Sequence, residues 1–366
     1  MGTHATTARR AGAAALAAAV LAGCASFSPD GGFGPVAGAV REHTGREAAW
    51  ARTETERQAL EARASALLAK GPLSADDAVQ VALFNNRGLQ AQLAELGLAE
   101  ADLVQAARLP NPRFTLHRVS DDHHYALERS ISFNILSLVT LPLATEVEKR
   151  RFEGARQRAA MDVLRLAADT RKAWIDAVAA EEAVRYLRRV RLAADAGADL
   201  AARMAKAGNW SALQRAREQG FYADAALAVA RAEQKAGSAR ERLTRHLGLW
   251  GPQAASLSLP ERLPDLPGAA RDRPDIEREA IATRLDVRAA MHDAEATARN
   301  LGLTKVPRLV NVLEFGASRE NEGRDEPYVR GYEISLEVPL FDWGTARTAK
   351  AETLYRQGAD RAGEAA

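Results

Sequence analysis

The chain has 366 residues, of which 47% are hydrophobic and 27% are charged, and its formal net charge is +2. This composition predicts an ordered protein, and with charges so nearly balanced nothing indicates a nucleic-acid-binding surface. The single cysteine excludes an internal disulfide and a cysteine-based metal site. Abundant alanine, leucine, arginine and glutamate favour long helices that pack together.

Residues 1–23 are predicted to form a lipoprotein signal peptide. Two arginines precede a short apolar run at residues 11–21, and Leu-Ala-Gly directly precedes Cys24. This order resembles a bacterial lipobox, in which the cysteine becomes the first residue and carries covalent lipid; the alternative is an ordinary signal peptide with an incidental cysteine. Alanine rather than aspartate at position 25 is the pattern of outer-membrane lipoproteins. Acyl chains supply an anchor but make no pore.

Residues 24–70 are predicted as a lipid-anchored tether and an N-terminal helix. The tether is rich in glycine, proline and serine up to residue 43, and one charged helix is expected from Thr44 to Lys70. Ser74 then provides a cap for a new helix, and helical character continues to the prolines at positions 110 and 112.

The pattern changes from a helical to a two-residue period after Pro112. Phe114 and Leu116 alternate with polar residues, and a polar stretch at 120–124 separates them from a second alternating stretch around Ile131 and Phe133. This pattern predicts a β-hairpin.

A long antiparallel helical hairpin is expected next. The chain is free of proline and helical in pattern from about Ala144 to Lys206, with apolar residues spaced by threes, fours and sevens as in a coiled coil. Gly208 is predicted to end this helix and Ser211 to start a second one that runs to about Leu247. Residues 252–274 contain four prolines and are predicted to form a linker.

The order of helix, strand, loop and strand occurs twice, in residues 71–251 and again in residues 275–366. The second copy has an alanine-rich helix that ends at Pro307, a strand around Val310–Ala317 and a last strand from Tyr332 to Leu340. Four strands cannot close a membrane barrel, because the smallest barrels need about eight, and an open strand edge is not tolerated in lipid. Membrane-spanning strands would therefore require several chains to share one barrel; the alternative is a soluble sheet packed on helices.

Polar residues line one side of the predicted strands. If the strands form a shared barrel, these residues face its lumen, although one side of a soluble sheet has the same pattern. The lumen candidates are Ser130, Ser132, Asn134, Glu333, Ser335 and Glu337.

The first hairpin tip contains side chains that suit zinc or copper. Adjacent residues in a strand point to opposite faces, so an exposed polar tip is the favoured interpretation. The metal candidates are His117, Asp121, Asp122, His123 and His124.

The chain has no catalytic-triad spacing, no His-Glu-x-x-His motif and no phosphate loop, which argues against an enzyme. No cofactor is expected besides the lipid on Cys24.

In three segments, Leu73–Asn86, Ala107–Pro112 and Val338–Gly344, the chain resembles the TolC-type outer-membrane efflux family. The repeat and the lipobox agree with this resemblance, which covers residues 44–366. It implies a mainly α protein with membrane β-structure: a long helical hairpin, plus two β-hairpins that give four strands to a shared trimeric barrel. It also implies a homotrimer in the outer membrane, lipid-anchored and facing the periplasm, that meets a periplasmic adaptor and an inner-membrane pump.

The chain departs from the family pattern in its second repeat. Family members end this repeat in a second long helical hairpin, but only residues 345–366 follow Gly344 here. The resemblance implies a passive exit duct for drugs or metal ions, and the departure implies that its second repeat is truncated. The alternative is a lipid-anchored periplasmic coiled-coil or interaction protein, or a non-conducting relative.

Overall fold

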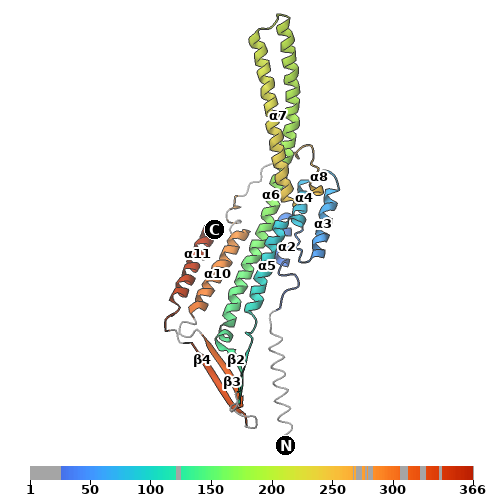
Figure 1. Cartoon of the computed structure of the whole chain (residues 1–366). Coiled ribbons are helices and arrows are strands. Elements are labelled where there is room, and N and C mark those ends of the chain that lie inside the picture. Colours follow the sequence, from blue (N-terminus) through green and yellow to red (C-terminus); the bar gives the residue numbers. More distant parts are fainter. Residues whose placement is uncertain are drawn as a thin grey trace. The chain divides into compact units, whose positions relative to one another are not determined.

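The computed structural model describes residues 26–120, 125–266, 268, 274–276, 278, 283–305, 312–321, 327–337 and 340–365. The chain divides into two compact units, each made of separate stretches, and each is described by itself. The elements in chain order are α2 (Gly34–Thr44), α3 (Glu54–Leu68), α4 (Ala75–Asn85), α5 (Arg87–Ala106), β1 (Arg113–Ser120), β2 (Tyr125–Asn134), α6 (Ile135–Lys206), α7 (Ala212–His246), α8 (Pro252–Ala255), α10 (Leu285–Lys305), β3 (Leu313–Asn321), β4 (Val329–Leu336) and α11 (Thr345–Ala365) (Figure 1).

The helical unit comprises residues 33–94 and 159–275. Its core joins α3 and α4 to the helices α6 and α7, with Leu243 and Leu247 fully buried. The Trp174 indole is buried in this core, and its Nε1–H donates to the Leu73 carbonyl at 2.8 Å. A buried indole keeps its donor satisfied in this way, so the contact fixes α6 against the start of α4.

Helices α6 and α7 form the expected antiparallel hairpin within this unit (Figure 1). Arg188 pairs with Glu233 at 2.7 Å, and Arg240 pairs with Glu181 at 3.1 Å, as an antiparallel register requires. Gly208 adopts a φ of +80° at the turn, a conformation that glycine reaches without strain. The residues predicted for the hairpin seam are buried or half-buried: Val163, Leu166, Ala173, Ala177, Val184 and Leu187.

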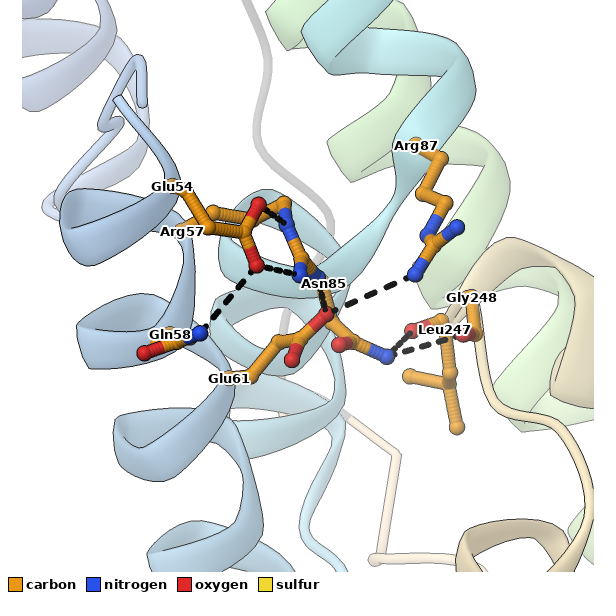
Figure 2. A network of polar contacts seen from close by, with 8 residues as sticks. All are labelled: Glu54, Arg57, Gln58, Glu61, Asn85, Arg87, Leu247 and Gly248. Atoms are coloured by element: carbon orange, nitrogen blue, oxygen red, sulfur yellow. Dashed lines mark hydrogen bonds and ion pairs between the residues drawn. The ribbon is translucent and has the colours of Figure 1, made fainter. Parts of the chain in front are cut away.

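Two asparagine side chains join the start of α5 and the end of α4 to the end of α7 by hydrogen bonds, and we call this contact the asparagine clasp. The Asn85 Nδ2 donates to the carbonyls of Leu247 at 3.1 Å and Gly248 at 2.9 Å (Figure 2). The Asn86 Nδ2 donates to the His246 carbonyl at 2.9 Å. The last carbonyls of a helix have no partner inside it, so these amides satisfy groups that α7 leaves open.

An ionic cluster on α3 lies beside this clasp (Figure 2). Arg57 contacts both Glu54 and Glu61, and Glu61 also lies 3.7 Å from the guanidinium of Arg87. The Gln58 Nε2 donates to Glu54 at 3.2 Å. Glu54 and Arg87 are exposed, and Arg57 and Glu61 are about one third exposed. Ion pairs this accessible to water contribute little stability, so the buried asparagine amide is the stronger link at this junction.

The sheet unit contains residues 95–158 and 276–366, together with the N-terminal stretch to Gly32. Its four strands pair antiparallel in the order β1-β2-β3-β4. Helix α10 joins the first part of α6 through two ion pairs, Arg158–Asp293 at 2.6 Å and Arg150–Glu295 at 3.1 Å. None of the helices in the described part of the chain combines the length and apolar character needed to cross a membrane.

The N-terminal region differs from its prediction. Helix α2 occupies residues 34–44, where a tether was expected, and buries Val36 and Val40. Gly45, with a φ of +65°, ends α2, so residues 44–70 are not one continuous helix. The composition of this segment predicts a tether, but burial of two valines stabilises a helix instead.

The boundaries of α6 and the second strand pair also differ. Helix α6 begins at Ile135, nine residues before the predicted start, and contains Pro142, although a proline inside a helix removes one backbone hydrogen bond. Strand β3 extends to Asn321, and β4 ends at Leu336, so the predicted last strand is too long.

Candidate functional site

The strand register brings five of the six lumen candidates to one side of one sheet. Ser132 pairs with Gly316, which in turn pairs with Glu333. Residues directly opposite each other in an antiparallel pair point to the same side. We call this side the polar face; the five candidates on it are Ser130, Ser132, Asn134, Glu333 and Ser335.

Three carboxylates that the sequence analysis missed lie on the same face. Glu314 pairs with Ser335, and its half-buried side chain lies 3.5 Å from the Arg113 guanidinium. Glu128 pairs with Glu320 on the neighbouring strand. Their alternation with apolar residues is visible in the sequence, but it indicates a shared face only once the pairing of β2 with β3 is known.

Glu128 and Glu320 form the most acidic position of the polar face. Like charges directly opposite in a sheet repel each other, and the arginines adjacent in sequence, Arg129 and Arg319, belong to the other face. On the other edge of β2, His117 of β1 pairs with Glu128. The polar face therefore attracts cations more strongly than anions.

Two of the lumen candidates have additional or different roles. The Asn134 Oδ1 accepts a hydrogen bond from the Ser137 backbone N–H at 2.8 Å, so this side chain caps α6. Glu337 follows the end of β4; it is exposed, and its backbone N–H donates to Val312 at 3.2 Å. Glu337 thus continues the ladder by one residue beyond the strand.

Only one of the five metal candidates lies within the described residues. His117 lies exposed on β1, on the polar face, whereas Asp121, Asp122, His123 and His124 lie outside the described residues, as does Cys24. Within the described ranges, no group of three or more histidine, cysteine, aspartate or glutamate side chains is arranged to hold a metal ion.

The opposite side of the sheet, which we call the apolar face, exposes large hydrophobic side chains. Phe114 is 67% exposed and Ile334 is 61% exposed. Contiguous exposed apolar patches mark protein or membrane contacts. The large exposed hydrophobic residues of this face are Phe114, Leu116, Ile131, Phe133, Phe315, Tyr332, Ile334 and Leu336.

Solved structures with this fold are outer-membrane channels or membrane proteins. The Campylobacter jejuni CmeC outer-membrane channel matches with a TM-score of 0.63 and 13% identity over 79% of this chain and 67% of that one. A membrane protein from Pseudomonas aeruginosa matches with a TM-score of 0.66 and 17% identity, covering 80% and 73% of the two chains. CusC, studied for its folding and transmembrane channel formation, matches with a TM-score of 0.63 and 14% identity, over 80% of this chain and 72% of CusC.

The fold is therefore that of the TolC-type outer-membrane efflux proteins, which confirms the resemblance and the fold class predicted from the sequence. Among curated proteins, the chain is 26% identical over 284 residues to the cobalt-zinc-cadmium resistance protein CzcC of Cupriavidus metallidurans. The match covers 75% of this chain and 65% of CzcC, so the chain spans less than two thirds of that relative's length. No family model matches the chain.

Proposed function

We propose that this chain is the outer-membrane exit duct of a tripartite efflux system. The observation that carries the proposal is the two-sided sheet, whose polar face contains carboxylates and whose apolar face is exposed. Four strands cannot close a barrel, but a homotrimer would supply twelve, above the minimum of about eight. In such a barrel the apolar faces meet lipid, and the polar faces line a water-filled passage.

The helical hairpin supports assembly with further chains. It exposes large apolar side chains on both helices, including Leu192, Leu200 and Phe221. Contact between hairpins of a trimer would cover such residues, as apolar faces of long helices require. The remaining partners in this proposal are a periplasmic adaptor and an inner-membrane pump, which supplies the energy, so the duct itself is passive.

The proposed cargo includes divalent metal cations. Three copies would bring the Glu128–Glu320 position to the lumen three times, and rings of carboxylates favour cations in a pore. CzcC, which is similar in sequence, is a cobalt-zinc-cadmium resistance protein. Drug-like cargo is the second candidate, and a competition experiment with zinc in the conductance assay separates the two.

Lipid on Cys24 would anchor the trimer to the periplasmic leaflet of the same membrane. Intact-mass measurement of the protein from purified outer membranes tests this part alone. The expected result is a mass that lacks residues 1–23 and carries acyl chains, and substitution Cys24→Ala should abolish the acylation.

Two measurements on one preparation test the duct. Native mass spectrometry should find three chains per particle, and planar-bilayer recording should find discrete, cation-preferring conductance steps. A monomer without conductance would overturn the proposal. It would instead support a lipid-anchored periplasmic protein without a pore.

A further inference from the structure

Three arginines lie side by side on the apolar face. Arg129 of β2 pairs with Arg319 of β3, which pairs with Arg330 of β4. We call these three residues the arginine row. All three side chains are exposed. Between the row and the ends of the strands that lead into the helices, the large side chains of this face are apolar.

The arginine row is not compensated by acidic side chains. Like charges directly opposite on neighbouring strands destabilise a sheet, yet neither Arg129 nor Arg330 pairs with any acidic residue in the described part of the chain. The guanidinium of Arg319 stacks on the Tyr328 ring at 3.6 Å. Glu128 and Glu320, adjacent in sequence, point to the polar face. The row therefore favours an external anion.

The position of the row along the strands indicates the surroundings of that anion. Arg129 lies six positions before Ile135, the first residue of α6, which corresponds to roughly 20 Å along the strand and, with the usual strand tilt, to roughly 15 Å of barrel height. The apolar band of membrane barrels is about 25 Å tall. Toward the hairpin turns, Tyr125 lies on the side of the sheet that carries the row, and the Tyr328 ring lies against the Arg319 guanidinium, as expected for aromatic residues at a membrane interface.

Charged residues are costly at the middle of a bilayer but nearly neutral at its interfaces. Long arginine side chains extend from within the apolar band toward the interface, so a row beside these tyrosines, in the outer part of the band, brings its guanidinium groups to the level of the lipid head groups. An open hollow of about 400 Å³ surrounds it, lined by Phe114, Arg129, Ile131, Ala317, Arg319 and Arg330 among others. This hollow offers guanidinium groups beside apolar side chains, which complements a phosphate group attached to acyl chains.

We propose that the arginine row binds the phosphate groups of lipid in the outer leaflet of the membrane. The inference rests on the proposed function, because that function directs the hairpin turns outward and the apolar face toward lipid. Arginine is suited to the task, since its planar fork binds phosphate oxygens in pairs. The row would fix the depth of the barrel in the membrane.

Native mass spectrometry of the detergent-purified full chain tests the proposal. The protein is incubated with phosphatidylglycerol, with phosphatidylcholine, or with inorganic phosphate. The test variant combines Arg129→Gln, Arg319→Gln and Arg330→Gln. A matched control combines Arg215→Gln, Arg217→Gln and Arg231→Gln, three exposed arginines of α7.

The wild-type and control proteins should retain phosphatidylglycerol in preference to phosphatidylcholine. Each arginine near an anionic membrane contributes on the order of a fivefold preference, so the triple variant should lose on the order of a hundredfold. Equal retention by the triple variant would overturn the inference. So would binding of inorganic phosphate as tight as binding of the lipid, which would identify a free anion as the ligand.

The same spectra, together with the planar-bilayer recording, separate failure of this inference from failure of the proposed function. A conducting trimer without preference for phosphatidylglycerol overturns the arginine-row inference alone. A wild-type protein that forms neither a trimer nor a conducting particle overturns both proposals.

Discussion

The helical unit and the sheet unit both contain amphipathic elements, but they cover their apolar sides differently. In the helical unit, α3, α4, α6 and α7 bury Leu243, Leu247 and Trp174 in a core that the chain supplies itself. In the described strands of the sheet unit, only Gly316 is buried. The comparison shows that the helical unit builds an apolar core from its own helices, whereas the described strands leave their large apolar side chains exposed; in the proposed duct, lipid covers them.

Two tryptophans give the sharpest test of this difference. Trp174 of the helical unit is 3% exposed, and Trp343 of the sheet unit is 53% exposed. We expect Trp174→Ala to lower the free energy of unfolding by about 3–5 kcal/mol, the usual cost of truncating a buried aromatic residue. The substitution also leaves the Leu73 carbonyl without its donor.

The matched variant Trp343→Ala should change stability by no more than about 0.5 kcal/mol, as for exposed positions. Urea unfolding in detergent measures both. If the two variants lost equal stability, the contrast between the units would be wrong.

The turn after α7 provides the next largest effect. Gly248 has a φ of +68°, and an added Cβ would lie 2.6 Å from the Asn85 carbonyl oxygen. Gly45, which ends α2, also has a positive φ, +65°, but an added Cβ there would meet nothing within 4 Å. Gly248→Ala should therefore cost about 3 kcal/mol, from backbone strain and overpacking together.

Gly45→Ala should cost only the strain of the left-handed conformation, about 1–2 kcal/mol. Thermal unfolding of the two variants compares them directly. Equal losses would mean that the Asn85 backbone does not crowd Gly248, and the helical unit would be less closely packed than the structure indicates.

The sequence predicts those features of the fold that local chemistry determines. Gly208 and Ser211 end one long helix and begin the next, and the observed caps confirm this. Helix α2 could not be predicted, because the burial of Val36 and Val40 depends on distant elements. The start of α6 was also misplaced, although Asn134 and its bond to Ser137 are a local signal.

The candidate site was only half predictable, for a related reason. The two-residue alternation predicts which side chains share a face within one strand, and it identified Ser130 and Ser132 together. The register between β2 and β3 joins segments far apart in the chain. Without that register, neither the Glu128–Glu320 pair nor the arginine row is visible.

Charge on the polar face gives a smaller, functional prediction for the sheet unit. Glu128→Gln combined with Glu320→Gln should lower the cation-to-anion permeability ratio of the conducting trimer by about threefold, because carboxylate rings set cation preference. Reversal potentials in a potassium chloride gradient measure the ratio.

The control for this variant is Glu218→Gln, a substitution on α7 in the helical unit. It should leave the ratio unchanged, and neither variant should change the number of chains per particle. A ratio unaffected by the double substitution would show that the polar face does not line the conducting passage.

The smallest expected effect lies at the edge of the helical unit. The Arg63 guanidinium donates to Glu47 at 2.6 and 3.1 Å and holds the pKa of that carboxyl below its ordinary value of 4.5. A lowered folded-state pKa adds stability at pH values above the ordinary pKa, and this stability is lost as the pH falls through the folded-state pKa.

Because both side chains are about half exposed, the Arg63–Glu47 pair contributes at most about 0.5 kcal/mol. Arg63→Gln should therefore destabilise the protein slightly at pH 7, and this penalty should shrink as the pH falls below 4.5, as measured by urea unfolding at pH 7 and at acid pH. An Arg63→Gln penalty that persisted at acid pH would assign the residue's role to its packing over the Phe84 ring, 4.2 Å from the guanidinium, and would extend the self-contained core of the helical unit to its surface.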